Sequence, residues 1–180
     1  MKFTQDFFSP IIPLWEKYLL PRFIDKPCVA LEIGSYEGMS AAWLLKNILT
    51  HPKSRITCLD IWIVDTHNGR NNDYGATFDL NMAEAGGGKV TKLSGVSNLV
   101  LRSLTDQFDF IYIDADHHAK AALSDAILCW PLLKKDGIII FDDYNHPDYD
   151  AKTGIDAFLA IWANELDVIY KGRQVMAEKR

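Results

Sequence analysis

The sequence contains few cysteines, and their spacing excludes a redox or zinc motif. Cys28, Cys58 and Cys129 are its three cysteines, and no two of them form a Cys-x-x-Cys pair. Each lies inside a segment that we expect to be a strand or a helix. Isolated thiols in such apolar segments are usually buried and behave as small hydrophobic side chains. We therefore interpret all three as buried free thiols.

A surplus of basic residues is also missing, and so is any long apolar run. The 19 Lys and Arg residues are outnumbered by 24 Asp and Glu residues, which gives a formal net charge of −5 and disfavours a dedicated nucleic-acid-binding protein. No segment approaches the roughly 20 apolar residues of a membrane-spanning helix. Residues 1–8 contain Lys2 and Asp6 and no signal-peptide core. We expect a cytoplasmic protein that binds neither nucleic acid nor a membrane.

The order of apolar segments predicts one α/β domain. A chain of 180 residues that is 48% hydrophobic and 24% charged fits a single globular core and leaves no room for a second domain. Apolar runs with helical segments between them predict strands at residues 28–33, 55–59, 89–93, 108–113 and 137–141. Residues 152–166 then predict a helix, and residues 167–170 and 174–178 a terminal hairpin. This pattern predicts a single-domain Rossmann-like, doubly wound sheet that is mostly parallel and has a C-terminal antiparallel strand.

Residues 1–27 form an N-terminal extension rich in aromatic residues. Pro10, Pro13 and Pro21 limit this extension to short helices. Its apolar side chains must cover the sheet of the same chain, a substrate cleft or a second subunit. Packing against its own core is favoured, because aromatic residues at helical spacing usually serve that purpose. A homodimer formed through this segment is the alternative.

Residues 61–88 are the hardest to place. Their first half is polar and rich in turn-forming residues, and residues 77–85 predict a short helix that is capped by Thr77 and ended by three glycines. A long loop at the ligand-binding edge of a sheet is a candidate lid. His67 and Arg70 are candidate substrate contacts there, although polar loop residues are more often simply solvated.

A glycine turn follows the first predicted strand. Gly34 and Gly38 flank this turn, which would bring backbone amides close to a ligand. A dinucleotide-binding fingerprint would need glycine at position 36, so Tyr36 counts against NAD or FAD. Glu32, in a buried strand, needs a partner such as a cationic or hydroxyl-rich ligand. Asp60 ends the second strand and suits the two hydroxyls of a ribose, with capping of the next segment as the alternative.

Acids also follow two later strands, over residues 108–144. Asp114 comes directly after residues 108–113, and Asp142 and Asp143 come directly after residues 137–141. A right-handed crossover connection usually returns the chain to a neighbouring position, roughly 4.8 Å away if the strands are adjacent. We therefore expect these acids to meet at the carboxyl edge of the sheet, where open α/β sheets bind ligands.

Residues 30–40, reading ALEIGSYEGMS, resemble the first motif of class I S-adenosylmethionine-dependent methyltransferases. The similarity extends over residues 28–144 and is greatest to the small metal-dependent O-methyltransferases, which include catechol and macrolide-sugar O-methyltransferases. It implies that residues 1–180 are a single methyltransferase domain. It also implies a cofactor site formed by Glu32, Gly34, Ser35, Tyr36, Gly38, Ser40, Asp60, Ser97 and Asp114. Within that site, Glu32, Gly34 and Ser40 would line the methionine end, Asp60 would hold the ribose, and Ser97 would lie near the adenine.

The same resemblance implies a divalent-metal site and a catalytic base. Asp114, Asp142 and Asp143 fall at the positions of the metal ligands, and His117 falls at the position of the base, so that His117 and Asp114 are the expected catalytic residues. Crowded carboxylates repel by roughly 4 kcal/mol per pair at an effective dielectric constant near 20. A hard divalent cation offsets this repulsion, and oxygen ligands suit Mg, Mn or Ca better than zinc. Asp116 and His118 could compete for these roles.

These residues predict an S-adenosylmethionine-dependent O-methyltransferase, assisted by a divalent cation such as Mg, that acts on a hydroxyl of a small sugar or phenolic substrate. Catechol enzymes usually have Lys at the base position and Asn as the last ligand, so His117 and Asp143 indicate a sugar-modifying relative instead. One alternative is an N- or carboxyl-methyltransferase that uses no metal. Another is a non-catalytic cofactor-binding or dimerisation module.

Overall fold

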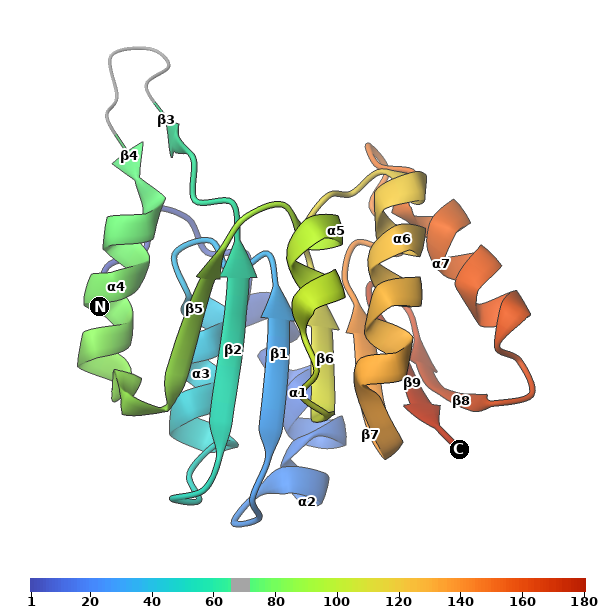
Figure 1. Ribbon diagram of the computed structural model, residues 1–180, viewed down its shortest axis with the longest axis horizontal. Helices are drawn as coiled ribbons and strands as arrows, with labels where there is room; N and C mark the ends of the chain where they lie inside the picture. The colour runs from blue at the N-terminus through green and yellow to red at the C-terminus, as the bar shows by residue number, and fades with distance from the viewer. Residues whose placement is uncertain (66–71) are drawn as a thin grey trace.

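The computed structural model describes residues 1–65 and 72–180 and confirms the predicted doubly wound fold. A seven-stranded sheet runs through the centre in the order β5-β2-β1-β6-β7-β9-β8 (Figure 1). Its first five strands are mutually parallel, and β9 is antiparallel to both β7 and β8. The strands are β1 (Val29–Ile33), β2 (Arg55–Asp60), β5 (Val90–Ser94), β6 (Phe108–Ile113), β7 (Leu133–Phe141), β8 (Leu166–Lys171) and β9 (Val175–Lys179).

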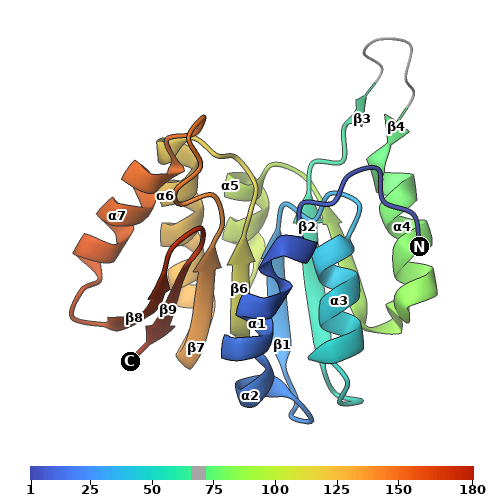
Figure 2. The same cartoon turned by 180° about the vertical axis from the view of Figure 1, so that it is seen from behind.

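Helices cover both faces of the sheet, and successive side chains of its buried central strands point to opposite faces. Ile111 and Ile113 of β6 face one helical layer, whereas Phe110 and Tyr112 face the other. The first layer contains α5 (Ser97–Val100), α6 (Ala119–Cys129) and α7 (Ala151–Ile161) (Figure 1). The second contains α1 (Ile12–Tyr18), α2 (Leu20–Phe23), α3 (Met39–Asn47) and α4 (Tyr74–Ala85) (Figure 2). The short 3-10 helices are η1 (Ser9–Ile11), η3 (Gly87–Lys89), η4 (Leu101–Ser103) and η5 (Trp130–Leu132).

The N-terminal extension packs onto the sheet of its own chain. As predicted, its prolines restrict it to short helices, since α1 has seven residues and α2 has four. Trp15 and Leu19 are fully buried. The indole ring of Trp15 packs edge-on against Phe110 and Tyr112 of β6, with ring centroids 5.6 and 4.9 Å apart. The structure therefore supports the core-packing interpretation, and a homodimer through this segment stays a prediction.

Two predicted helix starts or ends were wrong, for local reasons. Helix α4 begins at Tyr74, three residues before the predicted start, because the Asp73 carboxylate caps it by accepting a 2.8 Å hydrogen bond from the Ala76 amide. Thr77 lies inside the helix, and its hydroxyl donates to the Asp73 carbonyl. Helix α7 ends at Ile161 rather than at residue 166, because Leu166 already belongs to β8 and is buried there.

Strand β7 also begins earlier than predicted. The strand was predicted over residues 137–141 only, but α6 stops at Cys129 and residues 134–136 already belong to β7. A register shift between Phe108 and Phe110 accommodates them, and Asp136 adopts a left-handed backbone with φ 62°. The Lys134 ammonium group pairs with Asp109 of β6 at 2.8 Å. Residues 134–136 therefore form a bulge of β7 between Leu133 and Ile138, the residues that pair with β6.

The candidate lid, residues 61–88, includes two short strands in addition to α4. These strands, β3 (Val64–Asp65) and β4 (Asn72–Asp73), pair antiparallel. His67 and Arg70 lie outside the described residues, so the lid and its substrate contacts stay predictions. Among the described helices, none is both long and apolar enough to cross a membrane.

The contact between α6 and α7 requires a glycine and provides a test of the fold. A Cβ atom at Gly154 would lie 2.0 Å from the carbonyl oxygen of Ala119, whereas a Cβ atom at Gly88 would have no heavy atom within 4 Å. We expect Gly154→Ala to lower the free energy of unfolding by about 1–3 kcal/mol, as overpacking typically does. Gly88→Ala, the matched control, should change it far less. Urea unfolding of both variants measures the difference, and equal stabilities would contradict the described packing.

Candidate active site at the carboxyl edge of the sheet

A cavity of about 720 Å³ opens at the carboxyl edge of the parallel strands. The ends of β1, β2, β6 and β7 and the loop after β5 line it, so the acids that follow different strands do meet at one edge, as predicted. Its wall includes the predicted residues Gly34, Tyr36, Asp60, Ser97, Asp114, His117, Asp142 and Asp143. A smaller cavity of about 60 Å³ adjoins it and is lined by Gly34, Ser35, Tyr36, Ser40 and Asp114. Of the predicted cofactor residues, all of which the structure describes, Glu32 and Gly38 line neither cavity.

Gly34 is required where the chain leaves β1. Its φ is +89°, and a Cβ atom would lie 1.8 Å from the carbonyl oxygen of Asp114. The missing side chain therefore lets the turn after β1 pass directly over the end of β6. Gly38 has a different environment, because a Cβ atom there would meet Phe78 and Met82 of α4. Gly34 brings the turn to the cavity, and Gly38 allows α4 to pack behind it.

Tyr36 occupies a backbone conformation that usually favours glycine. Its φ is 46°, in the left-handed region, although its side chain is bulky. Asp60 and Trp62 hold it there: the Tyr36 amide donates to Asp60 Oδ2 at 2.8 Å, and the Trp62 indole donates to the Tyr36 carbonyl at 2.8 Å. The other carboxylate oxygen of Asp60 accepts from the Trp62 amide at 2.9 Å. Asp60 therefore organises the turn after β1 as well as facing the cavity.

Glu32 is fully buried beneath this turn. Its Oε1 accepts a hydrogen bond from the Ser40 hydroxyl at 2.5 Å, and its Oε2 has no partner among the described residues. Burial raises the pKa of Glu32 above its ordinary value, and the hydrogen bond from Ser40 opposes that rise. A buried acid with one unsatisfied oxygen is unfavourable, so Glu32 is incompletely compensated beneath this turn.

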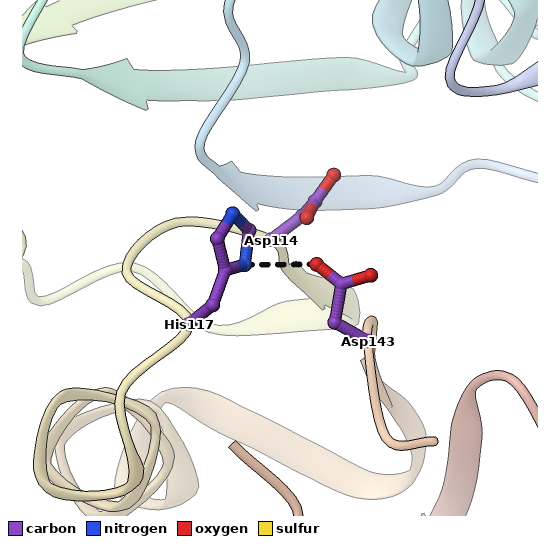
Figure 3. Close-up of side chains that lie close together, drawn as sticks. All are labelled: Asp114, His117 and Asp143. Carbon is purple, nitrogen blue, oxygen red and sulfur yellow. Dashed lines mark ion pairs between the residues drawn. The ribbon is translucent and has the colours of Figure 1, made fainter. Parts of the chain in front are cut away.

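Three side chains face one another across the ends of β6 and β7 (Figure 3). Ligand atoms of Asp114, His117 and Asp143 all lie within 4.8 Å of one another. Nδ1 of His117 is 2.9 Å from Oδ2 of Asp143, which has a left-handed φ of 53°. Strained backbone of this kind is concentrated at functional sites. We call Asp114, His117 and Asp143 the acid–histidine cluster.

The charges of this cluster are unbalanced. Burial raises the pKa of Asp114 well above its ordinary range, and the charges of Asp142 and Asp143 raise it further. Burial also acts to raise the pKa of Asp143, but the hydrogen bond and charge of His117, together with the charges of His146 and Arg173, leave that pKa below its ordinary value. The imidazole thus satisfies Asp143, whereas Asp114 has excess negative charge around it. An arrangement like this attracts a cation.

Asp142 belongs to the cavity wall but is held differently. Its Oδ2 accepts hydrogen bonds from the Tyr112 hydroxyl at 2.5 Å and from the side-chain amide of Gln174 at 3.1 Å. Its Oδ1 accepts one from the backbone amide of Asp143 at 2.8 Å. The Tyr112 hydroxyl also lies 3.1 Å from Asp114. Sequence reasoning missed both partners. Tyr112 gave a usable signal, since a tyrosine in a doubly buried strand needs a partner for its hydroxyl; Gln174, in a surface-like hairpin turn, gave none.

The far end of the cavity contains a second buried acid that sequence reasoning missed. Asp125 of α6 is 2% exposed, its Oδ1 accepts from the Ser97 hydroxyl at 2.7 Å, and its Oδ2 has no partner among the described residues. Burial raises the pKa of Asp125 from 3.8 to about 6, against the effect of the Ser97 hydrogen bond. The hydroxyl proton of Ser97 is therefore already used in a hydrogen bond to Asp125.

Asp116 and His118, the alternatives to Asp114 and His117 as metal ligand and base, form a hydrogen-bonded pair with each other. Nδ1 of His118 lies 2.6 Å from Oδ1 of Asp116, which also accepts from the His118 amide at 3.0 Å. The His118 side chain is 84% exposed. Asp150, rather than Asp116, accepts from the Ala119 amide at the start of α6, at 2.8 Å. His117 is therefore the histidine that faces the acids.

Comparison with known proteins is consistent with this fold. A family model described as "Methyltransferase domain" matches residues 31–144. Among curated proteins, none is similar enough to match the chain. Solved structures with the same fold include an O-methyltransferase from Bacillus cereus in complex with S-adenosylhomocysteine, which is 22% identical with a TM-score of 0.63; the alignment covers 84% of this chain and 74% of that one.

Two further structures show that the fold serves different acceptors. The O-methyltransferase TomG from Streptomyces achromogenes, involved in tomaymycin synthesis and solved with S-adenosylmethionine, is 21% identical, with coverages of 84% and 72% and a TM-score of 0.63. A ribosomal protein L11 methylase from Lactobacillus delbrueckii subsp. bulgaricus is 20% identical, with coverages of 89% and 74% and a TM-score of 0.58. At such low identity these likenesses show the fold alone, and the acceptor must be argued from the site.

Asp125 makes the stability of the protein depend on pH. Its folded-state pKa, about 6, lies above the ordinary value of 3.8, so the neutral acid is favoured in the folded state, and stability falls as pH rises through this window. Asp125→Asn removes the titration and keeps an acceptor for Ser97. From about pH 4 to about pH 7, the unfolding free energy of the variant should gain up to about 3 kcal/mol relative to the wild type. Urea unfolding without ligand measures this change, and parallel pH profiles would contradict it.

Proposed function

The chain belongs to the methyltransferase-domain family, and we propose that this S-adenosylmethionine-dependent methyltransferase is a divalent-metal-assisted O-methyltransferase acting on a small hydroxylated molecule. The acid–histidine cluster is the observation that carries the proposal. It places hard oxygen ligands and an imidazole at the edge of the sheet where this fold binds ligands. The proposal therefore needs three parts: a donor site, a cation site and a base.

The donor site is the part of the two cavities that follows β1, β2 and β5. We assign Asp60 to the ribose hydroxyls, Ser97 to the adenine end, and the turn of Gly34, Ser35 and Tyr36, with Ser40 and Asp114, to the methionine end. When bound, S-adenosylmethionine supplies a methyl group on a positively charged sulfur. The unpartnered Oε2 of buried Glu32 supports a cationic ligand above it. Gly38 contributes from behind the turn, by letting α4 pack close to it.

The cation site consists of Asp114, Asp142 and Asp143. All three line the larger cavity, and the raised pKa of Asp114 reflects their mutual repulsion after burial. A donor set of carboxylates fits a hard divalent cation such as Mg²⁺. When bound, such a cation would polarise the acceptor hydroxyl and lower its pKa. The ligand atoms that lie within 4.8 Å of one another belong to Asp114, Asp143 and His117 rather than to Asp142, so the test below must separate a base from a ligand.

His117 is held in the orientation that a base needs. Its Nδ1 faces Asp143, and its ring stacks on Tyr149 with centroids 4.3 Å apart and planes 21° apart. Nε2 is then the atom that takes the proton from the acceptor hydroxyl. Deprotonating an alcohol of pKa ~15.7 with a histidine of pKa ~6.5 would cost roughly 12 kcal/mol, and a phenol of pKa ~10 roughly 5 kcal/mol. This gap is the reason that the base and the cation site belong together.

The acceptor side of the cavity combines apolar and charged groups. Phe7 and Tyr149 line it with exposed aromatic side chains, and Arg173 lines it near Asp143. Apolar walls with few polar groups are typical of small-molecule sites. They support a sugar or phenolic acceptor, whose ring lies on the apolar wall while a hydroxyl reaches the acids.

Replacing His117 tests the proposed mechanism. With a hydroxylated acceptor identified from a panel and labelled S-adenosylmethionine, His117→Ala should lower kcat by about 10²- to 10⁴-fold, the usual contribution of a general base. Affinities for Mn²⁺ and S-adenosylhomocysteine, measured by calorimetry, should stay within about threefold, because a base does not hold either one. His118→Ala is the matched control, since this exposed neighbour pairs with Asp116 instead.

Three outcomes would contradict parts of this assignment. Full turnover by His117→Ala would exclude His117 as the base. Loss of Mn²⁺ affinity in the same variant would make His117 a ligand rather than a base. Activity that survives exhaustive EDTA treatment would favour methyl transfer to an amine or a carboxylate without a metal.

A further inference from the structure

A buried chain of hydrogen bonds connects the N-terminal helix α1 to the acidic edge. The Trp15 indole donates to Gln174 Oε1 at 2.9 Å, and the Gln174 amide nitrogen donates to Asp142 Oδ2 at 3.1 Å. The Tyr112 hydroxyl joins the same oxygen of Asp142 at 2.5 Å and lies 3.1 Å from Asp114. Trp15, Gln174 and Tyr112 are each at most 1% exposed. We call Trp15, Gln174, Tyr112 and Asp142 the buried relay.

The donor and acceptor atoms of the buried relay determine the direction of its hydrogen bonds. An indole nitrogen is only a donor, so Trp15 requires the carbonyl oxygen of the Gln174 amide. The NH₂ group of Gln174 must then face Asp142. An ionised carboxylate is only an acceptor, so this is the one amide orientation that satisfies both neighbours. Without the indole N–H, the Asp142 carboxylate alone would hold the Gln174 side-chain amide in this orientation.

The backbone around Gln174 is fixed to the end of β7. Residue 174 lies in the turn between β8 and β9, and Val175 pairs with Phe141, the residue before Asp142. The Tyr144 amide donates to the Arg173 carbonyl at 2.9 Å, and the Asn145 side chain donates to the Gly172 carbonyl at 2.8 Å. Figure 2 shows α1 in front of the sheet, with this turn at the edge where β7 ends. Two segments far apart in the sequence therefore converge on Asp142.

The relay leaves Asp142 hydrogen-bonded but not neutralised. Gln174 and Tyr112 are uncharged donors, so they compensate for the burial of the Asp142 side chain without bringing a positive charge to it. Tyr112 has a single proton to share between Asp142 and Asp114, and the contact with Asp142 is the shorter. Among the described residues, Asp114 thus receives only a share of this one proton, through the longer contact. Hydrogen bonds therefore fix the Asp142 carboxylate in place, whereas Asp114 has less compensation and is the acid that a cation would stabilise most.

We propose that Gln174 and Trp15 are positioning residues for the cation site, with Trp15 setting the orientation of the Gln174 amide and Gln174 holding the carboxylate of Asp142. The inference rests on the proposed metal-assisted function. It extends the site to the N-terminal helix and to the terminal hairpin, neither of which contributes one of the proposed ligands. Outer partners of this kind typically change metal affinity by about 10- to 100-fold when they are removed.

Mn²⁺ binding to the full chain, measured by electron paramagnetic resonance, tests the proposal. Gln174→Met should weaken Mn²⁺ affinity by about 10- to 100-fold, and Trp15→Phe should weaken it by less but in the same direction. The double variant should lose no more than Gln174→Met alone, because Trp15 acts only through Gln174. Affinity for S-adenosylhomocysteine should not change in any of them. Trp162→Phe is the matched control, since the buried Trp162 Nε1 has no partner among the described residues.

The outcomes separate this inference from the proposed function. Unchanged Mn²⁺ affinity in Gln174→Met, additive losses in the double variant, or an equal loss in Trp162→Phe would each overturn the relay. A wild-type protein that binds no Mn²⁺ would instead contradict the metal-assisted function. In that case, metal-free crystal structures of Gln174→Met and Trp15→Phe decide the relay: a rotated Asp142 carboxylate supports it, and an unmoved one overturns it.

Discussion

Repulsion among the carboxylates that end β6 and β7 constrains much of the surrounding structure. Parallel pairing of these strands brings Asp114 close to Asp142 and Asp143 in a partly buried place, where each negative charge makes the others harder to accommodate. The protein compensates unequally. Asp143 faces an imidazole, Asp142 receives three neutral hydrogen-bond donors, and Asp114 shares the proton of a tyrosine. The remaining excess of negative charge is what the proposed cation would offset.

Compensating these charges involves residues far from the acids in the sequence, in the N-terminal helix α1 and in the turn between β8 and β9. The N-terminal helices complete the core beneath β6, and the same Trp15 that packs on Phe110 and Tyr112 also donates to Gln174. On the other side of the cavity, Asp60 holds Tyr36 in its left-handed conformation, so that the donor turn and the end of β2 form one unit. Gln174 and Asp60 are thus polar side chains that hold neighbouring parts of the cavity wall in position.

Much of this arrangement could be predicted from the sequence because it depends on local pattern. Apolar runs indicate buried strands, and the acids that follow these runs are visible in the sequence, so the mostly parallel sheet and the meeting of Asp114 with Asp142 and Asp143 at one edge could be predicted. The extent of β7 could not be predicted, because residues 134–136 form a bulge between Leu133 and Ile138, and only the pairing of those two residues with β6 makes the stretch part of a strand. Gln174 and Asp125 were missed for a related reason, since only tertiary packing buries a glutamine of a hairpin turn or an aspartate of a helix.

The most direct test of the central claim is a crystal structure with S-adenosylhomocysteine and Mn²⁺, using anomalous scattering to locate the ion. We expect one anomalous peak bounded by carboxylate oxygens of Asp114, Asp142 and Asp143, with Nε2 of His117 facing the space beside it. A structure with the cofactor product in the larger cavity and no anomalous peak at these acids, at saturating Mn²⁺, would contradict metal-assisted methyl transfer.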